Sequence, residues 1–268
     1  MSTNLSPAMG SSLATLARKE CKAVAKALAN RKDRHRGIHE ARKAIRRLRS
    51  LLALVGDTVG PEAAKIDIAL RNQARRLSAL RDSQVAVAMA EKLAIADSTG
   101  EWTIAAQMLA VRRDLLLEKE LGKDPGFARR IAATADIAVV LDKLRWKRVS
   151  QTLLRRSIKQ SLRRVKKSER DAAEQATPAS LHRWRRRVRR LRLQLEALHA
   201  LDRVSNAAAL AGAAHNSKSA KALAHLADQL GWRQDIQVLR AALKTVPDAT
   251  MLASLRKRLR LETKLARH

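Results

Sequence analysis

The residues with the clearest chemical potential are arginines, lysines and histidines that recur at helical spacing in two places along the chain. The first stretch carries one histidine and five cations: His39, Arg42, Lys43, Arg46, Arg47 and Arg49. The second stretch repeats the arrangement: His182, Arg185, Arg186, Arg189, Arg190 and Arg192. Guanidinium groups bind phosphate oxygens in a planar fork, and ammonium groups bind them as point charges. Cations at this density indicate a phosphate polymer rather than a small molecule held in one deep pocket.

Both stretches are predicted to form amphipathic helices. At about 100° per residue, most of these cations share a face with the histidine of their stretch. The opposite face is apolar in the first copy: Ala41, Ala44, Ile45, Leu48, Leu52 and Val55. It is apolar in the second copy too: Trp184, Val188, Leu191, Leu195 and Leu198. Residues 39–49 span about 15 Å of helix axis, so one helix could contact several successive phosphates.

The two stretches share the pattern His-x-x-Arg-[Lys/Arg]-x-x-Arg-Arg-Leu-Arg, which resembles the CHAD family, the helical domains named for their histidines. Residues 77–85 and 230–238 are similar to a second block of that family, Leu-Gly-x-x-[Arg/Asn]-Asp, with Asp82 matching Asp235. Ser78 stands in place of the usual Gly, and Gln234 in place of Arg or Asn. The resemblance covers nearly the whole chain. It implies an all-α, internally duplicated domain that binds inorganic polyphosphate and has no established catalytic activity.

The charge and the aromatic content limit the classes of partner. The 268 residues include 56 Lys and Arg against 25 Asp and Glu, which gives a net charge of +31. Such a field favours a polyanionic partner. Aromatic residues make up 2% of the chain, whereas single-stranded nucleic acids are usually held by bases stacked on aromatic rings. Polyphosphate is therefore the first prediction, and a protein that binds duplex nucleic acid is the main alternative.

Catalysis and metal binding are not expected from the residues. No nucleophile elbow, Walker loop or His-Glu-x-x-His motif occurs. Each basic stripe lacks an acid that could join His39 or His182 as a metal ligand, and the single cysteine, Cys21, excludes a thiolate zinc site. We expect a non-catalytic protein without a cofactor or metal; a polyphosphate-processing enzyme is the second alternative. His39 and His182 are predicted either to bind phosphate or to serve structure, and Asp82 and Asp235 to form ion pairs or helix caps.

The whole chain is predicted to form one all-α unit. It comprises two pseudo-symmetric antiparallel helical bundles, at residues 12–122 and 127–266, which share a central basic groove. The boundary is placed at the glycine and proline cluster of residues 122–126. Residues 61–96 are expected to form one long helix. No segment alternates in the manner of a β-strand.

Further cations are predicted as secondary phosphate contacts: Arg18, Lys22, Lys26, Arg71, Arg75, Arg156, Lys159, Arg163, Lys166, Lys218 and Lys221. Neither a signal peptide nor a membrane-spanning run of apolar residues is visible. We therefore expect a cytoplasmic protein, with polyphosphate granules as a candidate location. The sequence leaves the oligomeric state and the partner proteins open.

Overall fold

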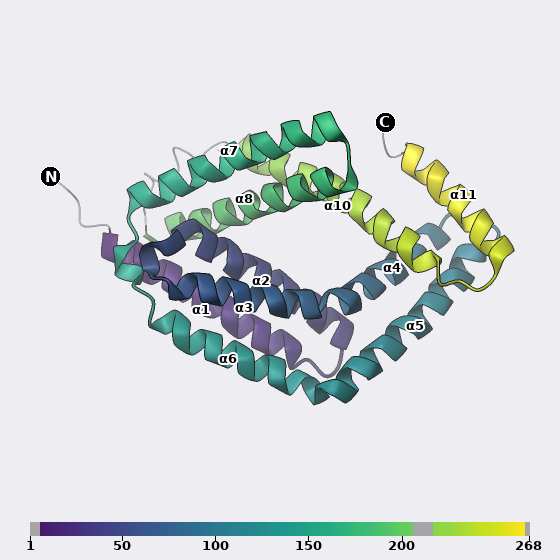
Figure 1. The fold of residues 1–268 in the computed structure, drawn as a ribbon, viewed down its shortest axis with the longest axis horizontal. Helices are drawn as coiled ribbons and strands as arrows, with labels where there is room; N and C mark the ends of the chain where they lie inside the picture. The colour runs from purple at the N-terminus through teal and green to yellow at the C-terminus, as the bar shows by residue number, and fades with distance from the viewer. Residues whose placement is uncertain (1–5, 206–216, 266–268) are drawn as a thin grey trace. The chain divides into compact units, whose positions relative to one another are not determined.

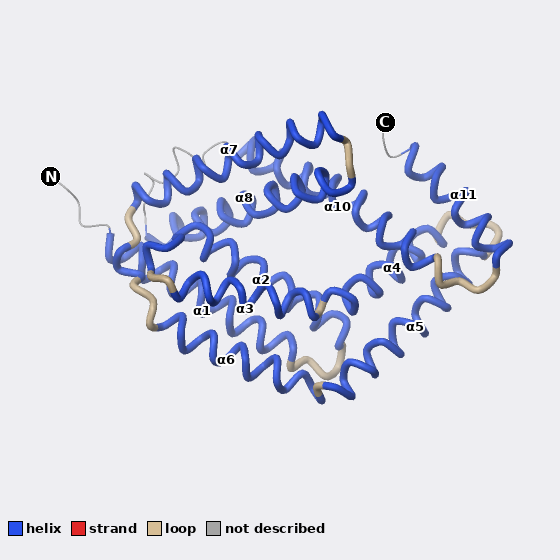
Figure 2. The backbone as a smooth tube through the Cα atoms, in the orientation of Figure 1, coloured by secondary structure: helices blue, strands red, loops and turns tan. Residues whose placement is uncertain are grey.

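The structure is a computed structural model that describes the backbone of residues 6–205 and 217–265, and the described part is helical without a strand (Figure 2). The longer helices are α1 (Ser6–Leu28), α2 (Arg34–Val55), α3 (Glu62–Arg76), α4 (Ser78–Ala94), α5 (Glu101–Lys123), α6 (Ala128–Asp142), α7 (Gln151–Gln175), α8 (Pro178–Ser205), α10 (Ser217–Leu243) and α11 (Ala249–Leu265). Short 3-10 turns lie between some of them: η1 (Gly56–Val59), η2 (Pro125–Phe127) and η3 (Trp146–Arg148). The predicted all-α fold is confirmed.

The chain divides into two compact units, and each unit combines a segment from either half of the sequence. Unit 1 comprises residues 1–75 and 127–228, and unit 2 comprises residues 76–126 and 229–268. The units therefore do not follow the predicted halves, and the repeat at 12–122 and 127–266 stays a prediction. The expected single helix over residues 61–96 was wrong, because Leu77 leaves helical geometry (φ −89°, ψ 2°) and separates α3 from α4. Its side chain is fully buried.

Unit 1 contains both motif helices, α2 and α8. The helix α1 packs between α2 and α6, while α8 packs against α7, α2 and α1 (Figure 1). The apolar face predicted for α2 is buried as expected. In α8 Val188, Leu191 and Leu198 are buried, and Trp184 and Leu195 are half-buried. Burial of these two faces places α2 and α8 in contact.

The ends of the motif helices follow from local chemistry. The Asp33 carboxylate accepts a hydrogen bond from the Arg36 backbone N–H at 2.9 Å and caps the start of α2. The helix ends at Gly56, whose φ of 56° lies in the left-handed region that favours glycine. At the start of α8 the Thr177 hydroxyl accepts from the Ser180 backbone N–H at 3.1 Å. Thr177 therefore caps the start of α8.

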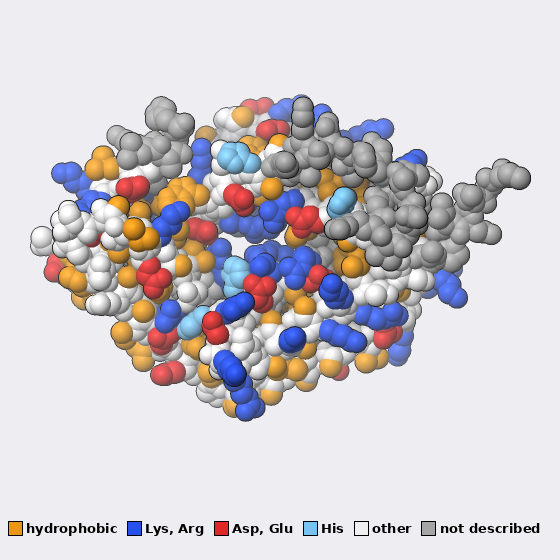
Figure 3. All heavy atoms as spheres, turned by 180° about the vertical axis from the view of Figure 1, so that it is seen from behind, with side chains coloured by type: hydrophobic (Ala, Val, Ile, Leu, Met, Phe, Trp, Pro, Cys, Tyr) orange, Lys and Arg blue, Asp and Glu red, His pale blue; other side chains and the backbone are white. Residues whose placement is uncertain are grey.

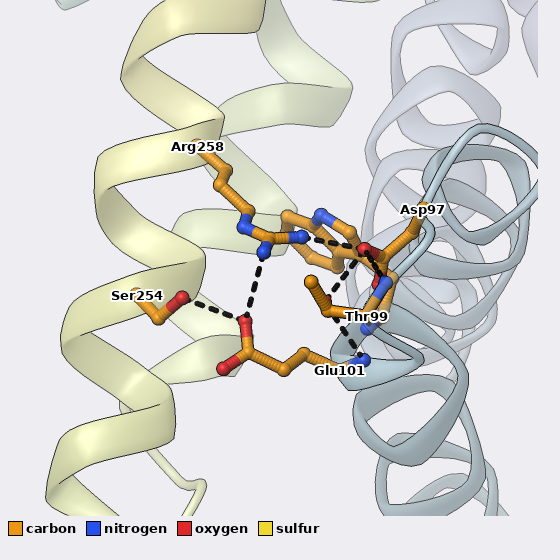
Figure 4. A network of polar contacts seen from close by, with 6 residues as sticks. Asp97, Thr99, Glu101, Ser254 and Arg258 are labelled. Atoms are coloured by element: carbon orange, nitrogen blue, oxygen red, sulfur yellow. Dashed lines mark hydrogen bonds and ion pairs between the residues drawn. The ribbon is translucent and has the colours of Figure 1, made fainter.

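Unit 2 contains α4, α5, α11 and the second part of α10. Its core is formed by apolar residues of all four helices, among them Val87, Trp102, Leu239 and Leu255. A polar clamp at one end joins α11 to the start of α5 (Figure 4). In this clamp Asp97 accepts hydrogen bonds from the Trp102 and Thr99 backbone N–H groups at 2.8 and 3.0 Å.

The α11 side of the clamp is supplied by Arg258 and Ser254. Arg258 bonds to Asp97 and lies 3.6 Å from Glu101, which also accepts from the Ser254 hydroxyl at 2.6 Å. The backbone hydrogen bond from Trp102, further donors in Thr99 and the Arg258 guanidinium hold the pKa of Asp97 well below its usual range. The clamp therefore contains an ionised carboxylate whose side chain is 1% exposed.

Candidate functional site

A group of arginines in unit 1 comes from α2, α7 and α8, which contact one another. We call this group the arginine cluster: Arg49 of α2, Arg164 of α7, and Arg183, Arg186, Arg187 and Arg190 of α8. The pKa of Arg190 is lowered by burial and by the neighbouring Arg49, Arg187 and Arg164, against the opposing effect of Asp67. Arg187 behaves in the same way, because burial and then Arg164, Arg186 and Arg183 lower its pKa. Arg187 and Arg190 are therefore each surrounded by several guanidinium groups, which come from three helices.

The acidic side chains of unit 1 neutralise this cluster only in part. Asp67 of α3 accepts two hydrogen bonds from Arg49, at 2.7 and 3.0 Å. Asp171 of α7 lies 3.9 Å from Arg183. Within the described residues, no carboxylate forms an ion pair with the other four members: Arg164, Arg186, Arg187 and Arg190. The arginine cluster therefore carries an excess of positive charge that the described part of the fold leaves uncompensated.

The cations of the first motif helix are largely engaged within unit 1. Arg47 donates to Glu20 of α1 at 2.8 Å, and Arg42 donates to the Ala74 carbonyl of α3. Lys43 pairs with Glu40 one turn earlier, at 3.1 Å. Together with the Arg49–Asp67 pair, these contacts tie α2 to α1 and α3. The histidine of this helix, His39, is exposed, and Arg46 is half-buried.

The cations of the second motif helix differ from one another in exposure and in partners. Arg185 is buried at 7% exposure, beside the apolar face rather than on an open basic face. Arg192 lies 3.3 Å from Glu196, one turn later on the same helix. Arg186 and His182 are exposed, and Arg189 and Arg190 are half-buried. Of the predicted set, the structure thus places Arg49, Arg186 and Arg190 in the arginine cluster.

Three members of the arginine cluster were not among the predicted contacts, namely Arg164, Arg183 and Arg187. A signal for two of them was present in the sequence. Arg183, Arg187 and Arg190 are spaced by four and three residues, so they form a second stripe on α8 beside the one that begins at His182. The next residue on this stripe, Gln194, is fully buried and donates to the Ser50 carbonyl of α2 at 3.4 Å. The C-terminal end of this stripe therefore faces α2, whereas Arg183 at its other end lies beside Asp171 of α7.

The predicted secondary cations are distributed over several surfaces. Arg18 forms an ion pair with Asp142, whereas Lys22, Lys26, Arg71, Arg75 and Lys166 are exposed. Arg156, Lys159 and Arg163 line a hollow of about 340 Å³ on α7. Lys218 and Lys221 belong to α10, but their side chains lie outside the described residues. Lys and Arg side chains are frequent on the face drawn in Figure 3, with fewer acidic side chains among them.

The two matched aspartates meet at a single arginine in unit 2. Arg81 donates to Asp82 at 2.9 Å and to Asp235 at 3.0 Å. The prediction that these acids form ion pairs is confirmed, and both pair with Arg81. Among the described residues, no group of three or more potential His, Cys, Asp or Glu ligands could hold a metal ion.

Comparison with known proteins decides the family. A family model for the CHAD domain matches residues 13–244. The chain belongs to the CHAD family. CHAD domains are associated with polyphosphate-related proteins.

A solved CHAD structure supports the fold. The crystal structure of the CHAD domain from the plant Ricinus communis is similar to this chain, with a TM-score of 0.65. The two sequences are 21% identical, over 97% of this chain and 87% of that chain. No curated protein matches the sequence. None of the described helices is long and apolar enough to cross a membrane.

Proposed function

We propose that this CHAD protein binds inorganic polyphosphate, without turning it over, through the arginine cluster of unit 1. The observation that carries the proposal is the excess charge at Arg187 and Arg190. Burial and neighbouring cations lower the pKa of both groups, so the fold holds them close together at a cost in stability. A polyanion that binds there compensates the cluster, because its oxygens accept from guanidinium donors that lack an acidic partner within the described residues.

The distribution of the guanidinium groups of the arginine cluster favours an extended ligand. They come from three helices, and the second motif helix presents several of them one turn apart. Successive turns are about 5.4 Å apart along a helix. A chain of phosphates can therefore contact several guanidinium groups at once, whereas a single phosphate contacts only one or two.

The aromatic residues support polyphosphate over single-stranded nucleic acid. Trp102, Trp146 and Phe127 are buried. Trp232 has the Lys92 ammonium 4.5 Å from its ring centroid, and Trp184 is half-buried on the apolar face of α8. Bases that stack on aromatic rings contribute about 1 to 3 kcal/mol each. These rings lie in cores or under a lysine, so an anion would be held mainly through its phosphates.

The proposal assigns binding and no catalytic residue. Guanidinium groups remain protonated near neutral pH and serve poorly as general acids or bases. Asp67, whose charge acts on Arg190, is already held by two hydrogen bonds from Arg49. The arginine cluster thus offers donors for phosphate oxygens, and the carboxylate beside Arg190 is already engaged.

The proposal is tested by incubating the full chain with long-chain polyphosphate and measuring binding and hydrolysis in the same samples. Titration calorimetry reports the affinity, and a colorimetric assay reports orthophosphate release with and without added magnesium or manganese. We expect saturable binding and no release above the rate in protein-free samples. Release that depends on the protein would replace the binding proposal with an enzymatic one, and absence of heat and of retention on a polyphosphate column would refute both.

A further inference from the structure

The second half of α5 in unit 2 carries apolar side chains that the described part of the fold covers only in part: Leu116, Leu117 and Leu121 are half-buried, whereas Val111 and Leu115 are exposed. The first half of α5 enters the core of unit 2 through its buried residues, which are Trp102, Ala105, Ala106 and Leu109. No residue from 110 to 123 is buried. This segment nevertheless carries Val111, Leu115, Leu116, Leu117 and Leu121. Helix segments of this composition are stabilised mainly by packing of their apolar face, so a packing partner is expected.

The most exposed of these side chains follow the spacing of a helix-pairing seam. Ile104 is 49% exposed, Val111 is 63% exposed and Leu115 is 60% exposed. Met108 lies between them in the sequence and packs only partly against the core of unit 2. The four residues are separated by four, three and four positions, which is the alternation of the two apolar positions in a coiled-coil heptad. They form a stripe, which we call the α5 seam.

The charges of α5 favour a protein over a polyanion on this seam. The helix has four basic residues (Arg112, Arg113, Lys119 and Lys123) and four acidic ones (Glu101, Asp114, Glu118 and Glu120), so its net charge is zero. The whole chain carries +31. A polyphosphate chain therefore gains little at α5, and a second copy of this cationic chain meets no net charge on this helix.

The flanks of the seam are complementary to one another. In the heptad set by the seam, Asp114 lies on one flank, and Arg112 and Lys119 lie on the other. When two such helices pair in parallel, each flank faces the opposite flank of the partner. Asp114 of one copy then faces Lys119 of the other, which lies five positions later in the sequence. Antiparallel pairing would place like flanks together. The Asp114 side chain is 51% exposed, so it can reach an external partner although Arg113 also bonds to it.

We propose that the α5 seam is the interface of a parallel, in-register dimer of this chain, in which α5 of each copy covers the seam of the other. The seam spans about two heptads, which is short, so the association is weak, with a dissociation constant on the order of micromolar. The dimer is a property beyond polyphosphate binding. It rests on unit 2 alone and is independent of the arginine cluster.

The first test is sedimentation velocity of the full chain over a protein concentration range of about 5 to 200 μM. We expect a concentration-dependent dimer, which Val111→Glu with Leu115→Glu weakens by at least about tenfold because it places charges in the seam. The matched control is Ile68→Glu with Ile95→Glu, which adds the same charge at residues that are 49% and 86% exposed and lie outside α5. The control should dimerise as the wild type does, and circular dichroism should show both variants folded.

The second test addresses the parallel register. Asp114→Lys alone and Lys119→Asp alone should each weaken the dimer, because each places like charges across the seam, and the two changes together should restore it. A monomer throughout the concentration range, a dimer that survives the seam substitutions, or single reversals without effect would overturn the proposal. Polyphosphate affinity of the seam variant should match the wild type, so failure of the dimer would leave the polyphosphate proposal untouched.

Discussion

The strongest consequence of the arginine cluster is that removing two of its charges should weaken ligand binding and strengthen the fold at once. We consider the double substitution Arg187→Gln with Arg190→Gln, which keeps most of the side-chain length. Neither arginine has a carboxylate ion pair within the described residues. Hydrogen bonds to charged groups contribute about 1.5 to 3 kcal/mol each. Two such contacts amount to about 3 to 6 kcal/mol, so we expect polyphosphate affinity to fall by at least about a hundredfold.

The effect on stability has the opposite sign. Burial and like charges oppose the charged forms of Arg187 and Arg190, as their lowered pKa values show. Neutral side chains remove this penalty, so the denaturation midpoint of the variant should rise. If these arginines served only to stabilise the structure, their replacement would instead lower the denaturation midpoint.

Titration calorimetry at two salt concentrations and urea unfolding measure the two effects. The logarithm of the binding constant should also fall less steeply with the logarithm of the salt concentration. By analogy with nucleic acids, the slope should decrease in magnitude by about 0.7 to 0.9 for each lost phosphate contact. The matched control is Arg31→Gln with Lys32→Gln, which removes the same charge at exposed residues before the start of α2. Arg49 lies about 22 Å along the helix axis from the first residue of α2. A folded Arg187/Arg190 variant with wild-type affinity, or one no weaker than the control, would refute the assignment of the site.

Two further predictions concern buried ionisable side chains, one in each unit. Because hydrogen bonds from Trp102 and Thr99 and the Arg258 guanidinium hold the pKa of Asp97 below its usual range, its contribution to stability is complete at neutral pH and is lost as the pH falls. The Asp97→Asn variant should therefore unfold at a lower urea concentration than the wild type at pH 7. The difference between their urea midpoints should narrow below about pH 4. A difference that stays constant as the pH falls would contradict this reasoning. Burial, with a smaller effect of Asp142, raises the pKa of the Cys21 thiol to about 11. At pH 8 its reaction with a disulfide reagent should be at least about a hundredfold slower in the native protein than in denaturant, and equal rates would contradict the burial.

The fold class could be predicted from the sequence because helical periodicity and breakers are local signals. The apolar faces of both motif helices were visible in this way, and the helix ends at Gly56 and Thr177 carry residue types that are typical of such positions. The break at Leu77 was not visible, because a leucine gives no local signal for a helix end. Its side chain is fully buried, and burial depends on the whole fold rather than on neighbouring residues in the sequence.

The candidate site could be predicted only in part, for a related reason. Sequence spacing shows which cations share a face of one helix, but it does not show which acids other helices bring to them. Glu20 and Asp67 engage Arg47 and Arg49 from two other helices. Conversely, Arg164 of α7 joins the arginine cluster through the packing of α7 against α8. The two motif copies therefore look alike in the sequence and differ in the structure.

The central claim, that the arginine cluster is suited to polyphosphate, is tested most directly by competition. Labelled duplex DNA is bound to the wild-type protein and displaced with long-chain polyphosphate or with unlabelled DNA, at matched phosphate concentration. We predict that polyphosphate displaces the label at a concentration at least about tenfold lower than DNA does, because a flexible chain can follow guanidinium groups on three helices whereas a duplex presents phosphates at fixed positions. The Arg187→Gln with Arg190→Gln variant should lose this preference. Displacement by DNA at an equal or lower phosphate concentration would contradict the account and make duplex nucleic acid the better ligand.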